Sequence, residues 1–483
     1  MTNIKEYNCH YCESEYEYAF IGFLETEGWK YTSGNKLSRV TKRDVLIEDD
    51  FKKFIADGNP DLTEDEVTQI YDTIRLVGAE SDFATLHKVY NWMVDGIQFT
   101  PKDGIARMIP LINFEKDGVK NIFRVVNQFT VEYTNNGQKE NRRPDVILFV
   151  NGMPLCIMEL KNPADANATI YDAWEQINIR YWRDIPHLLH YCPLACISDG
   201  VKTRLGTVRT PYEHFYAWRR VNDGDVVSTL PFAETETMIK GVYSPERFLE
   251  IFRDYIYFQD SIYDSDEVEI VCRYPQFFAA RLLKQSIVDS VVTKSGRGGT
   301  YFGATGCGKT YTMAFLARQL ALRCTDISEI GSPTIILIVD RDELQKQGAK
   351  LFTKSTEFLN LGEVSVVKNR AQLRQELGAR QSGGFYICTI QKFCDREDDK
   401  IGLINDRQNI ICFSDEAHRT QLEHSKKIQF SKDADANMKA MVSKPYAKVL
   451  KEAFPQATFV GFTGTPIAET YQTFGDEIDR YTM

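Results

Sequence analysis

The chain contains 483 residues, of which 43% are hydrophobic and 26% charged, a size and composition that predict two or three folded domains. Its formal net charge of −10 excludes a histone-like coat of positive charge, although a local basic groove would still bind nucleic acid. No apolar run approaches the length of a membrane span, the N-terminus lacks the apolar segment of a secretion signal, and the scattered cysteines suit reduced core thiols, so we expect a soluble cytoplasmic protein.

The N-terminal part of the chain has apolar residues at helical spacing. This spacing predicts a helix over residues 15–31 and a helical region over residues 49–93. Thr63 and Glu66 have the spacing of a capping box, which predicts that a helix begins between them. Glu17 lies on the first predicted helix. It is either a solvated surface charge or an outer carboxylate of a metal site.

Further along, the apolar period changes from that of helices to that of strands. Consecutive strands are predicted over residues 122–131, 145–150 and 155–161. Alternation places Glu159 and Lys161 on one face of the last strand, fourteen residues after Asp145. Two carboxylates that hold Mg²⁺, with a lysine that polarises the phosphate, are what a metal-dependent phosphodiesterase needs. The alternative is a salt-bridged strand edge, because the pattern is short.

The loop between these strands decides whether the two acids can share a metal. A regular two-residue turn at Asn151-Gly152 would set Asp145 opposite Met158 and turn Glu159 to the other face of the sheet. We therefore predict an odd-length loop, or a bulge near the turn or near Pro154, that brings both acids to one face.

A glycine-rich stretch over residues 303–310 fits the pattern G-x-x-x-x-G-K-[ST] at every position. Its glycines allow backbone N–H groups to converge on phosphates, Lys309 supplies a positive charge, and the Thr310 hydroxyl can ligate Mg²⁺. The predicted phosphate-binding residues are Gly303, Gly306, Gly308, Lys309 and Thr310. Cys307, inside this loop, is either a reactive thiolate favoured by Lys309 and the following helix or an inert small residue.

Short apolar runs separated by helical segments follow this loop, which is typical of a buried parallel sheet. The runs cover residues 334–340, 385–389, 410–413 and 458–462. One of them leads into Asp415 and Glu416, where a central strand would end. Asp415 can hold Mg²⁺ through water, and Glu416 can orient and deprotonate an attacking water.

Several motifs together resemble known families. The phosphate loop, Asp415-Glu416-Ala417-His418 and Thr463-Gly464-Thr465-Pro466 are similar, in that order, to motifs I, II and III of superfamily 2 helicases and translocases of the DEAH type. Gln276 sits where that superfamily carries an adenine-reading glutamine. The earlier Asp…Glu-x-Lys pattern resembles the PD-(D/E)xK nuclease core, and a nuclease that precedes such a motor is similar to the restriction subunit of type I restriction-modification enzymes.

The resemblance implies a PD-(D/E)xK endonuclease domain with a mixed sheet over residues 1–245, followed by a RecA-like parallel-sheet lobe over residues 246–483. It implies ATP and Mg²⁺ as cofactors, translocation along double-stranded DNA, cleavage of that DNA, and a complex with methyltransferase and specificity subunits. Two alternatives remain open at this point. One is a repair helicase-nuclease outside restriction, and the other is an ATP-gated DNA-binding module with a vestigial nuclease site.

Two departures from the family pattern bear on these expectations. The family's nuclease helix carries Gln-x-x-x-Tyr, whereas four residues separate Gln176 from Tyr181 here, which puts the role of Gln176 in doubt. The chain also ends soon after Pro466, before a second motor lobe. The resemblance therefore implies an N-terminal fragment without full motor activity.

Overall fold

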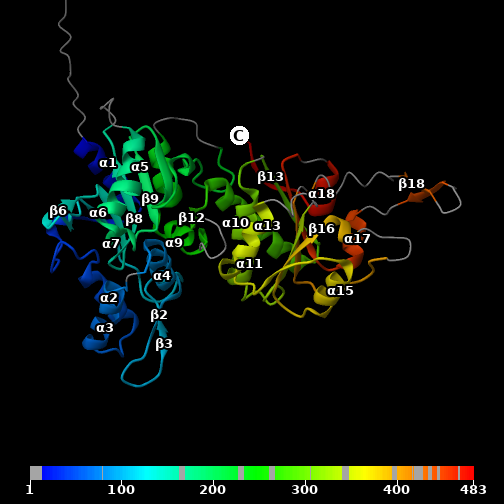
Figure 1. Ribbon diagram of the computed structural model, residues 1–483, viewed down its shortest axis with the longest axis horizontal. Helices are drawn as coiled ribbons and strands as arrows, with labels where there is room; N and C mark the ends of the chain where they lie inside the picture. The colour runs from blue at the N-terminus through cyan, green and yellow to red at the C-terminus, as the bar shows by residue number, and fades with distance from the viewer. Residues whose placement is uncertain are drawn as a thin grey trace, which may run out of the picture. The chain divides into compact units, whose positions relative to one another are not determined.

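The computed structural model describes most of the chain, in two compact units that we treat separately (Figure 1). The described residues are 13–78, 80–162, 169–226, 233–259, 267–304, 306–339, 347–393, 400–415, 417, 428–432, 438–442, 446–465 and 468–482. The units comprise residues 1–273 and 274–483. Among the described helices, none is long and apolar enough to cross a membrane.

The first unit begins with four α-helices. They are α1 (Glu13–Thr26), α2 (Glu48–Gly58), α3 (Glu64–Arg75) and α4 (Asp82–Asp95), with a 3-10 turn, η1 (Gly34–Lys36), after the first of them. The predicted capping box is confirmed. The Thr63 hydroxyl accepts from the Glu66 backbone N–H, and the Glu66 carboxylate accepts from the Thr63 backbone N–H at 2.8 Å, which satisfies two backbone donors at the start of α3.

A six-stranded mixed sheet forms the centre of the first unit, in the order β1-β4-β7-β8-β9-β10. Its strands are β1 (Lys30–Ser33), β4 (Phe123–Asn127), β7 (Val146–Val150), β8 (Met153–Leu160), β9 (Leu194–Ser198) and β10 (Thr203–Thr207). The β4-β7-β8 strands are antiparallel neighbours, whereas β1 with β4 and β8 with β9 are parallel pairs. Every residue of β7 and β8 is buried, as expected for strands covered on both faces.

Three two-stranded ribbons lie outside this sheet. They are β2 (Ile97–Phe99) with β3 (Arg107–Ile109), β5 (Val131–Asn135) with β6 (Gln138–Arg142), and β11 (Ile256–Gln259) with β12 (Val268–Val271). Residues 246–273 form part of α9 and the β11-β12 ribbon within the first unit, so the compact units divide further along the chain than the boundary expected from the sequence between residues 245 and 246. The β12 strand packs on β10, which explains why this segment stays with the first unit.

The remaining helices of the first unit follow β8 and β10. They are α5 (Ile170–Glu175), a π-helix labelled η2 (Gln176–Tyr181), α6 (Trp182–Asp184), α7 (Pro186–Leu189), the 3-10 turn η3 (Tyr212–His214), α8 (Glu234–Val242) and α9 (Pro245–Asp254). The first three run as one continuous helical segment, and α5 packs on β8 and β9.

The second unit contains a seven-stranded sheet in the order β15-β16-β14-β17-β20-β13-β21, with every neighbouring pair parallel. The strands are β13 (Arg297–Gly303), β14 (Thr334–Val339), β15 (Val364–Val366), β16 (Phe385–Thr389), β17 (Ile410–Ser414), β20 (Thr458–Thr463) and β21 (Glu477–Tyr481). A separate ribbon pairs β18 (Ile428–Lys432) with β19 (Met438–Val442). The expected parallel sheet is confirmed.

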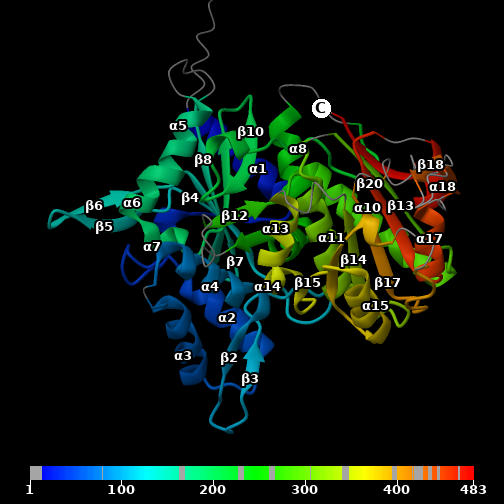
Figure 2. The same cartoon turned by 45° about the vertical axis from the view of Figure 1, so that its right-hand side comes forward.

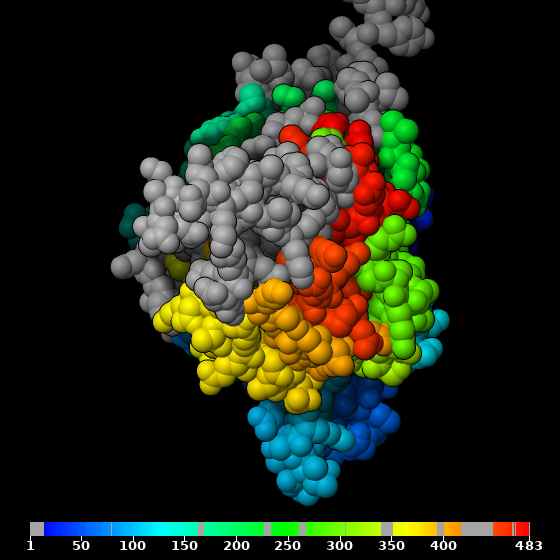
Figure 3. Space-filling view, turned by 90° about the vertical axis from the view of Figure 1, so that its right-hand side faces the viewer, coloured from blue at the N-terminus to red at the C-terminus, as the bar shows by residue number. Residues whose placement is uncertain are grey.

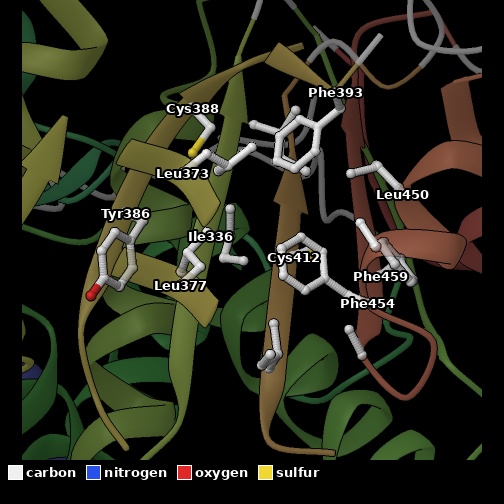
Figure 4. Close-up of a cluster of buried hydrophobic side chains, with 14 of the residues drawn as sticks. Ile336, Leu373, Leu377, Tyr386, Cys388, Phe393, Cys412, Leu450, Phe454 and Phe459 are labelled. Carbon is white, nitrogen blue, oxygen red and sulfur yellow. The ribbon is translucent and has the colours of Figure 1, made fainter. Parts of the chain in front are cut away.

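Helices cover both faces of this sheet (Figure 1). They are α10 (Tyr274–Thr293), α11 (Lys309–Arg323), α13 (Gln347–Lys354), α14 (Thr356–Leu359), α15 (Arg370–Ala379), the 3-10 turn η5 (Ile390–Lys392), α17 (Tyr446–Ala453) and α18 (Ala468–Phe474). Leu373 and Leu377 of α15 and Leu450 of α17 bury against Ile336 and Cys412 of the sheet (Figure 4). Figure 3 shows yellow, orange and red segments of this unit on the side turned to the viewer. The fold class expected from the sequence, a mixed-sheet α/β domain followed by a RecA-like parallel-sheet domain, is confirmed.

Candidate functional site

The hairpin between β7 and β8 combines a tight turn with a bulge. Val150 pairs with Met153 across Asn151-Gly152, whose φ values of 51° and 78° are those of a type I′ turn. The register then shifts, because Phe149 pairs with Pro154 but Leu148 pairs with Cys156. The residue between those two partners is therefore an extra one on β8.

This bulge brings the two predicted acids together. Val146 pairs with Met158, so the next position places Asp145 opposite Glu159 on the same face. The Leu160 backbone N–H donates to Asp145 Oδ2 at 2.8 Å, which fixes the aspartate at the edge of β8. The predicted bulge near Pro154 is confirmed, and the structure rules out the regular hairpin that would have separated the carboxylates.

Glu159 is a fully buried carboxyl group, and one of its two oxygens lacks a hydrogen-bond partner among the described residues. Its Oε1 accepts from the Tyr181 hydroxyl at 2.6 Å, whereas its Oε2 has no hydrogen-bond partner in the described part of the chain and lies 3.8 Å from Lys161 Nζ. Burial, and then repulsion from Asp145, raise the pKa of Glu159 well above its ordinary value. Burial also raises the pKa of Asp145, against the effects of Lys161 and Arg143. A cation between the two acids would stabilise both as carboxylates.

Lys161 is held by a chain of hydrogen bonds that returns to Glu159. Its Nζ donates to Gln176 Oε1 at 3.0 Å, and Gln176 Nε2 donates to the Tyr181 hydroxyl at 2.8 Å. That hydroxyl then donates to Glu159. The chain therefore fixes the lysine and the glutamate relative to each other, and Tyr181 joins the site although the sequence analysis did not assign it a role.

The π-helix explains how Gln176 and Tyr181 meet despite their unusual separation. Residues 176–181 form the π-helix between two α-helical segments. A π turn contains one more residue than an α turn, so residues five apart lie on one face. The wider π turn thus accommodates the residue that is extra relative to Gln-x-x-x-Tyr. Gln176 can therefore contact both Lys161 and Tyr181.

The opposite side of the same helical segment is fixed to the loop after β10. Three side chains spaced four residues apart donate to two backbone carbonyls. The bonds run from Trp174 Nε1 to Thr210 O at 2.9 Å, from Asn178 Nδ2 to Val208 O at 3.0 Å and to Thr210 O at 3.1 Å, and from Trp182 Nε1 to Val208 O at 2.8 Å. The extra residue therefore bulges on a side that these contacts leave unchanged.

Deleting Ile179, which is 47% exposed, is expected to convert the π turn to an α turn and to keep the phosphodiester cleavage predicted from the sequence within a few-fold of the parent rate. The shortened segment would read Gln-x-x-x-Tyr and keep its inward face. Deleting Ala173, which is buried in α5, would instead rotate the rest of the helical segment, including Gln176 and Tyr181, by about 100° relative to the sheet. Equal loss of activity in the two deletions, measured as nicking rates of folded protein, would contradict the π-turn account.

Glu17 is a buried carboxylate and not a solvated surface charge. It is 5% exposed, and its two carboxylate oxygens accept from Asn127 Nδ2 and Gln128 Nε2, each at 2.6 Å. Gln128 in turn donates its backbone N–H to Asp145 O at 3.1 Å. The interpretation of Glu17 as a solvated charge is wrong, and its hydrogen bonds support the strand that carries Asp145.

The donor set of this site suits a hard divalent cation. No group of three or more His, Cys, Asp or Glu side chains is arranged as metal ligands within the described ranges, so the paired Asp145 and Glu159 are the candidate ligands. Mg²⁺ is commonly held by one or two carboxylates and keeps several waters. The unpartnered Oε2 of Glu159 fits such an ion, because a buried carboxylate oxygen without a donor or a cation is costly.

The phosphate loop of the second unit lies between β13 and α11. Gly306 and Gly308 have φ values of 85° and 84°, which L side chains rarely adopt. A Cβ on Gly308 would also overlap Gln276 Nε2, whose amide donates to Gly308 O at 3.4 Å. Lys309 Nζ donates to Gly303 O at 3.3 Å, across the loop. The backbone therefore forms a cradle that a phosphate can approach, with the lysine already on its inner side.

Other predicted nucleotide-site residues lie at the same edge of the sheet. Thr310 is half-buried in the first turn of α11, directly after the loop. Asp415 follows β17, and its backbone N–H donates to Ile338 O at 2.9 Å. Both β13 and β17 neighbour β20 in a parallel sheet, so their carboxyl ends point the same way. Glu416, the predicted water-activating residue, lies outside the described residues.

Of the two alternatives for Cys307, the structure supports the inert small residue. The side chain is 6% exposed, and burial raises the pKa of the thiol, although Lys309 acts in the opposite direction. A Cβ on Gly303 would lie 2.8 Å from the Cys307 sulfur. The cysteine therefore acts as a small residue packed under the loop.

Comparisons with known proteins match two families to successive parts of the chain. The family described as type I restriction enzyme R protein N terminus (HSDR_N) matches residues 11–214, and the SWI2/SNF2 ATPase family matches residues 275–483. The HindI endonuclease subunit of a type I restriction enzyme from Haemophilus influenzae is 30% identical over 98% of this chain and 44% of its own length. The putative MjaIXP endonuclease subunit from Methanocaldococcus jannaschii is 30% identical over 97% of this chain and 44% of its own length.

This chain thus spans less than half the length of the curated relatives it matches. A solved fragment of a putative HsdR subunit from Vibrio vulnificus YJ016 is 15% identical, covers 74% of this chain and 54% of that one, and has a TM-score of 0.25, which adds no weight. The two family matches follow each other in the order of the two structural units and extend over most of the sequence. The chain is therefore related, over nearly its whole length, to the endonuclease subunits of type I restriction enzymes.

Proposed function

We propose that this protein is the restriction and motor subunit of a type I restriction endonuclease, which couples ATP hydrolysis to movement along duplex DNA and cleaves the DNA with Mg²⁺. The observation that carries the nuclease part is the bulged hairpin, because it places Asp145 and Glu159 on one face beside Lys161. The match to the model of the R protein N terminus and the similarity to type I endonuclease subunits support the restriction role.

In the nuclease site, Asp145 and Glu159 would hold Mg²⁺, which supplies charge that activates a water and stabilises the phosphate in the transition state. Lys161 would place a positive charge beside the scissile phosphate. Tyr181 and Gln176 act as positioning residues, since one orients Glu159 and the other holds the lysine ammonium group. The buried surroundings strengthen each of these interactions relative to water.

In the second unit, the glycine cradle and Lys309 would bind the phosphates of ATP, and Gln276 would read the adenine. Thr310 and Asp415 would hold the Mg²⁺ of the nucleotide, and Glu416 would orient the attacking water. The cradle suits a phosphate because Gly306 and Gly308 adopt φ values that favour glycine and the lysine already spans the loop.

The relatives imply the partners. We infer that this chain acts with a methyltransferase and a specificity subunit that read the DNA sequence and its methylation, because the proteins it resembles are endonuclease subunits of type I enzymes. The site would work inside the cell, where these subunits and the DNA meet.

Two variants separate the two chemistries. Glu159→Gln is expected to abolish the nicking of supercoiled DNA that Mg²⁺ supports and EDTA stops, while leaving ATP binding unchanged. Lys309→Ala is expected to abolish ATP binding, measured by calorimetry, and to leave the nuclease fold intact. Nicking by Glu159→Gln at the parent rate would remove the nuclease proposal and favour a vestigial site. ATP binding by Lys309→Ala with unchanged affinity would remove the proposed nucleotide site.

A further inference from the structure

The β5-β6 ribbon extends away from the body of the first unit (Figure 2). Among the described strands, β5 and β6 pair with each other and with no third strand, from Val131 opposite Arg142 to Asn135 opposite Gln138. The connection is a second type I′ turn, in which Asn136 and Gly137 have φ values of 47° and 79°. The ribbon is therefore a defined hairpin arm and not part of the sheet that holds the site.

The outer part of this arm is polar and lacks exposed large apolar side chains. Its exposed residues are Thr134, Asn135, Asn136, Gly137, Gln138, Lys139 and Asn141. The β2-β3 ribbon of the same unit differs, because it exposes 69% of Ile105 in its loop and 54% of Met108. Protein interfaces depend on buried aromatic and apolar anchors, which the β5-β6 arm does not offer. Amide, hydroxyl and ammonium groups are instead those that contact sugars, phosphates and base edges.

The charges of the arm also favour a polyanion. Lys139 near the tip and Arg143 at the base are exposed, and no ion pair to either occurs within the described ranges. The acid nearest the tip, Glu140, is engaged on the arm itself, since it accepts from the Tyr133 hydroxyl at 2.5 Å and from Asn135 Nδ2 at 2.9 Å. Glu132 lies near the base, half-buried, at the end away from the tip.

The base of the arm is tied to the nuclease site at two points. Arg142, the last residue of β6, bonds Asp184 at 2.7 Å, and Asp184 ends the helical segment that carries Tyr181. Burial raises the pKa of Asp145, and the positive charge of Arg143 acts against that rise. Only Pro144 separates these two residues in sequence. A partner bound along the arm would therefore be held at a fixed distance from the carboxylate pair.

We propose that the β5-β6 ribbon lies in a groove of duplex DNA beside the scissile phosphate. Lys139 and Arg143 contact backbone phosphates, and the amide side chains near the tip contact sugars and base edges. A two-stranded ribbon has the width that the major groove of B-DNA admits. The proposal deepens the proposed nuclease function and rests on it for the identity of the substrate.

The test shortens the arm without changing its turn or its base. Deleting the two opposed pairs Thr134/Lys139 and Asn135/Gln138 joins Tyr133 to Asn136 and Gly137 to Glu140, which keeps the type I′ turn and the strand alternation. A second variant combines Lys139→Ala with Arg143→Ala. The control is Lys116→Ala, which removes one exposed positive charge elsewhere in the same unit. Binding of a labelled 30-base-pair duplex is measured by anisotropy in EDTA, so that no cleavage occurs.

Both ribbon variants are expected to raise the Kd for duplex DNA by about tenfold or more. The double substitution should also lower the slope of log Kd against log salt by about 2, because two phosphate contacts are lost. Unchanged DNA affinity and salt slope in folded variants would overturn the proposal. A loss confined to binding of the methyltransferase and specificity subunits would overturn it too, and would make the arm a protein-docking surface. Ribbon-dependent DNA binding without any Mg²⁺-dependent cleavage by the parent protein would leave the groove contact standing and remove the nuclease function alone.

Discussion

Replacing Lys161 by alanine is expected to reduce Mg²⁺-dependent DNA cleavage by about 10²- to 10³-fold, the usual effect of removing one group that stabilises transition-state charge. The lysine is the cation nearest the unpartnered oxygen of Glu159, at 3.8 Å, and its position is fixed by Gln176. Its loss removes a positive charge from a buried site, where charge interactions are stronger than in water.

The measurement is a single-turnover nicking assay on supercoiled DNA, with Lys116→Ala as the charge-matched control. Far-ultraviolet circular dichroism and a thermal melt check that the Lys161 variant is folded. Gln176→Ala should lie between the parent and the Lys161 variant, because it frees the ammonium group without removing it. A folded Lys161→Ala protein that cleaves at the parent rate would show that the catalytic centre is elsewhere.

Gly152→Ala is expected to destabilise the first unit by about 2 to 5 kcal/mol. The left-handed conformation costs about 1 to 2 kcal/mol for a residue with a Cβ, and forced overpacking typically adds about 1 to 3 kcal/mol. Both terms apply, because Gly152 has a φ of 78° and an added Cβ would overlap Ile47 O and lie 2.9 Å from Phe51 N. These are backbone atoms that cannot rotate away.

The β5-β6 turn supplies the control. Gly137 has nearly the same φ, 79°, but an added Cβ there has nothing within 4 Å. Gly137→Ala should therefore cost only the conformational part, about 1 to 2 kcal/mol. Denaturant unfolding gives the loss of unfolding free energy in each variant, and the difference between the two losses is the cost of the clash at Gly152. Equal destabilisation would mean that the neighbours of Gly152 move aside, and the buried turn would then be less rigid than we infer.

The parts of this protein that the sequence predicts well are those with a local cause. The alternation of side chains along strands predicted the bulge. With a regular two-residue turn Asp145 and Glu159 would lie on opposite faces, and one extra residue on β8 brings them to the same face. The capping box of α3 followed from two residues at fixed spacing. The parallel sheet followed from apolar runs that need cover on both faces.

The parts that it does not predict depend on distant contacts. The helical segment that contains the π turn at residues 176–181 is attached to the carbonyl groups of Val208 and Thr210, about thirty residues away, through Asn178. Glu17 is buried because two amide side chains from another strand meet it. The boundary of the first unit moved beyond residue 245 because β12 packs on β10. The spacing of residues in the sequence does not predict these long-range contacts.

The two Asn-Gly turns also differ in their chemical lifetime. An asparagine followed by glycine loses its side-chain nitrogen when the next backbone nitrogen attacks the side-chain carbonyl and closes a five-membered imide ring. Asn151 is protected, because it is fully buried and its carboxamide bonds the Ile122 N–H, Leu111 O and Asn121 Oδ1. Asn136 is exposed at the tip of the ribbon and free to turn toward the ring geometry. Water then opens the neutral imide and leaves a carboxylate. Ageing of the protein would thus spare the turn between Asp145 and Glu159 and place a new negative charge on the arm that we propose contacts DNA.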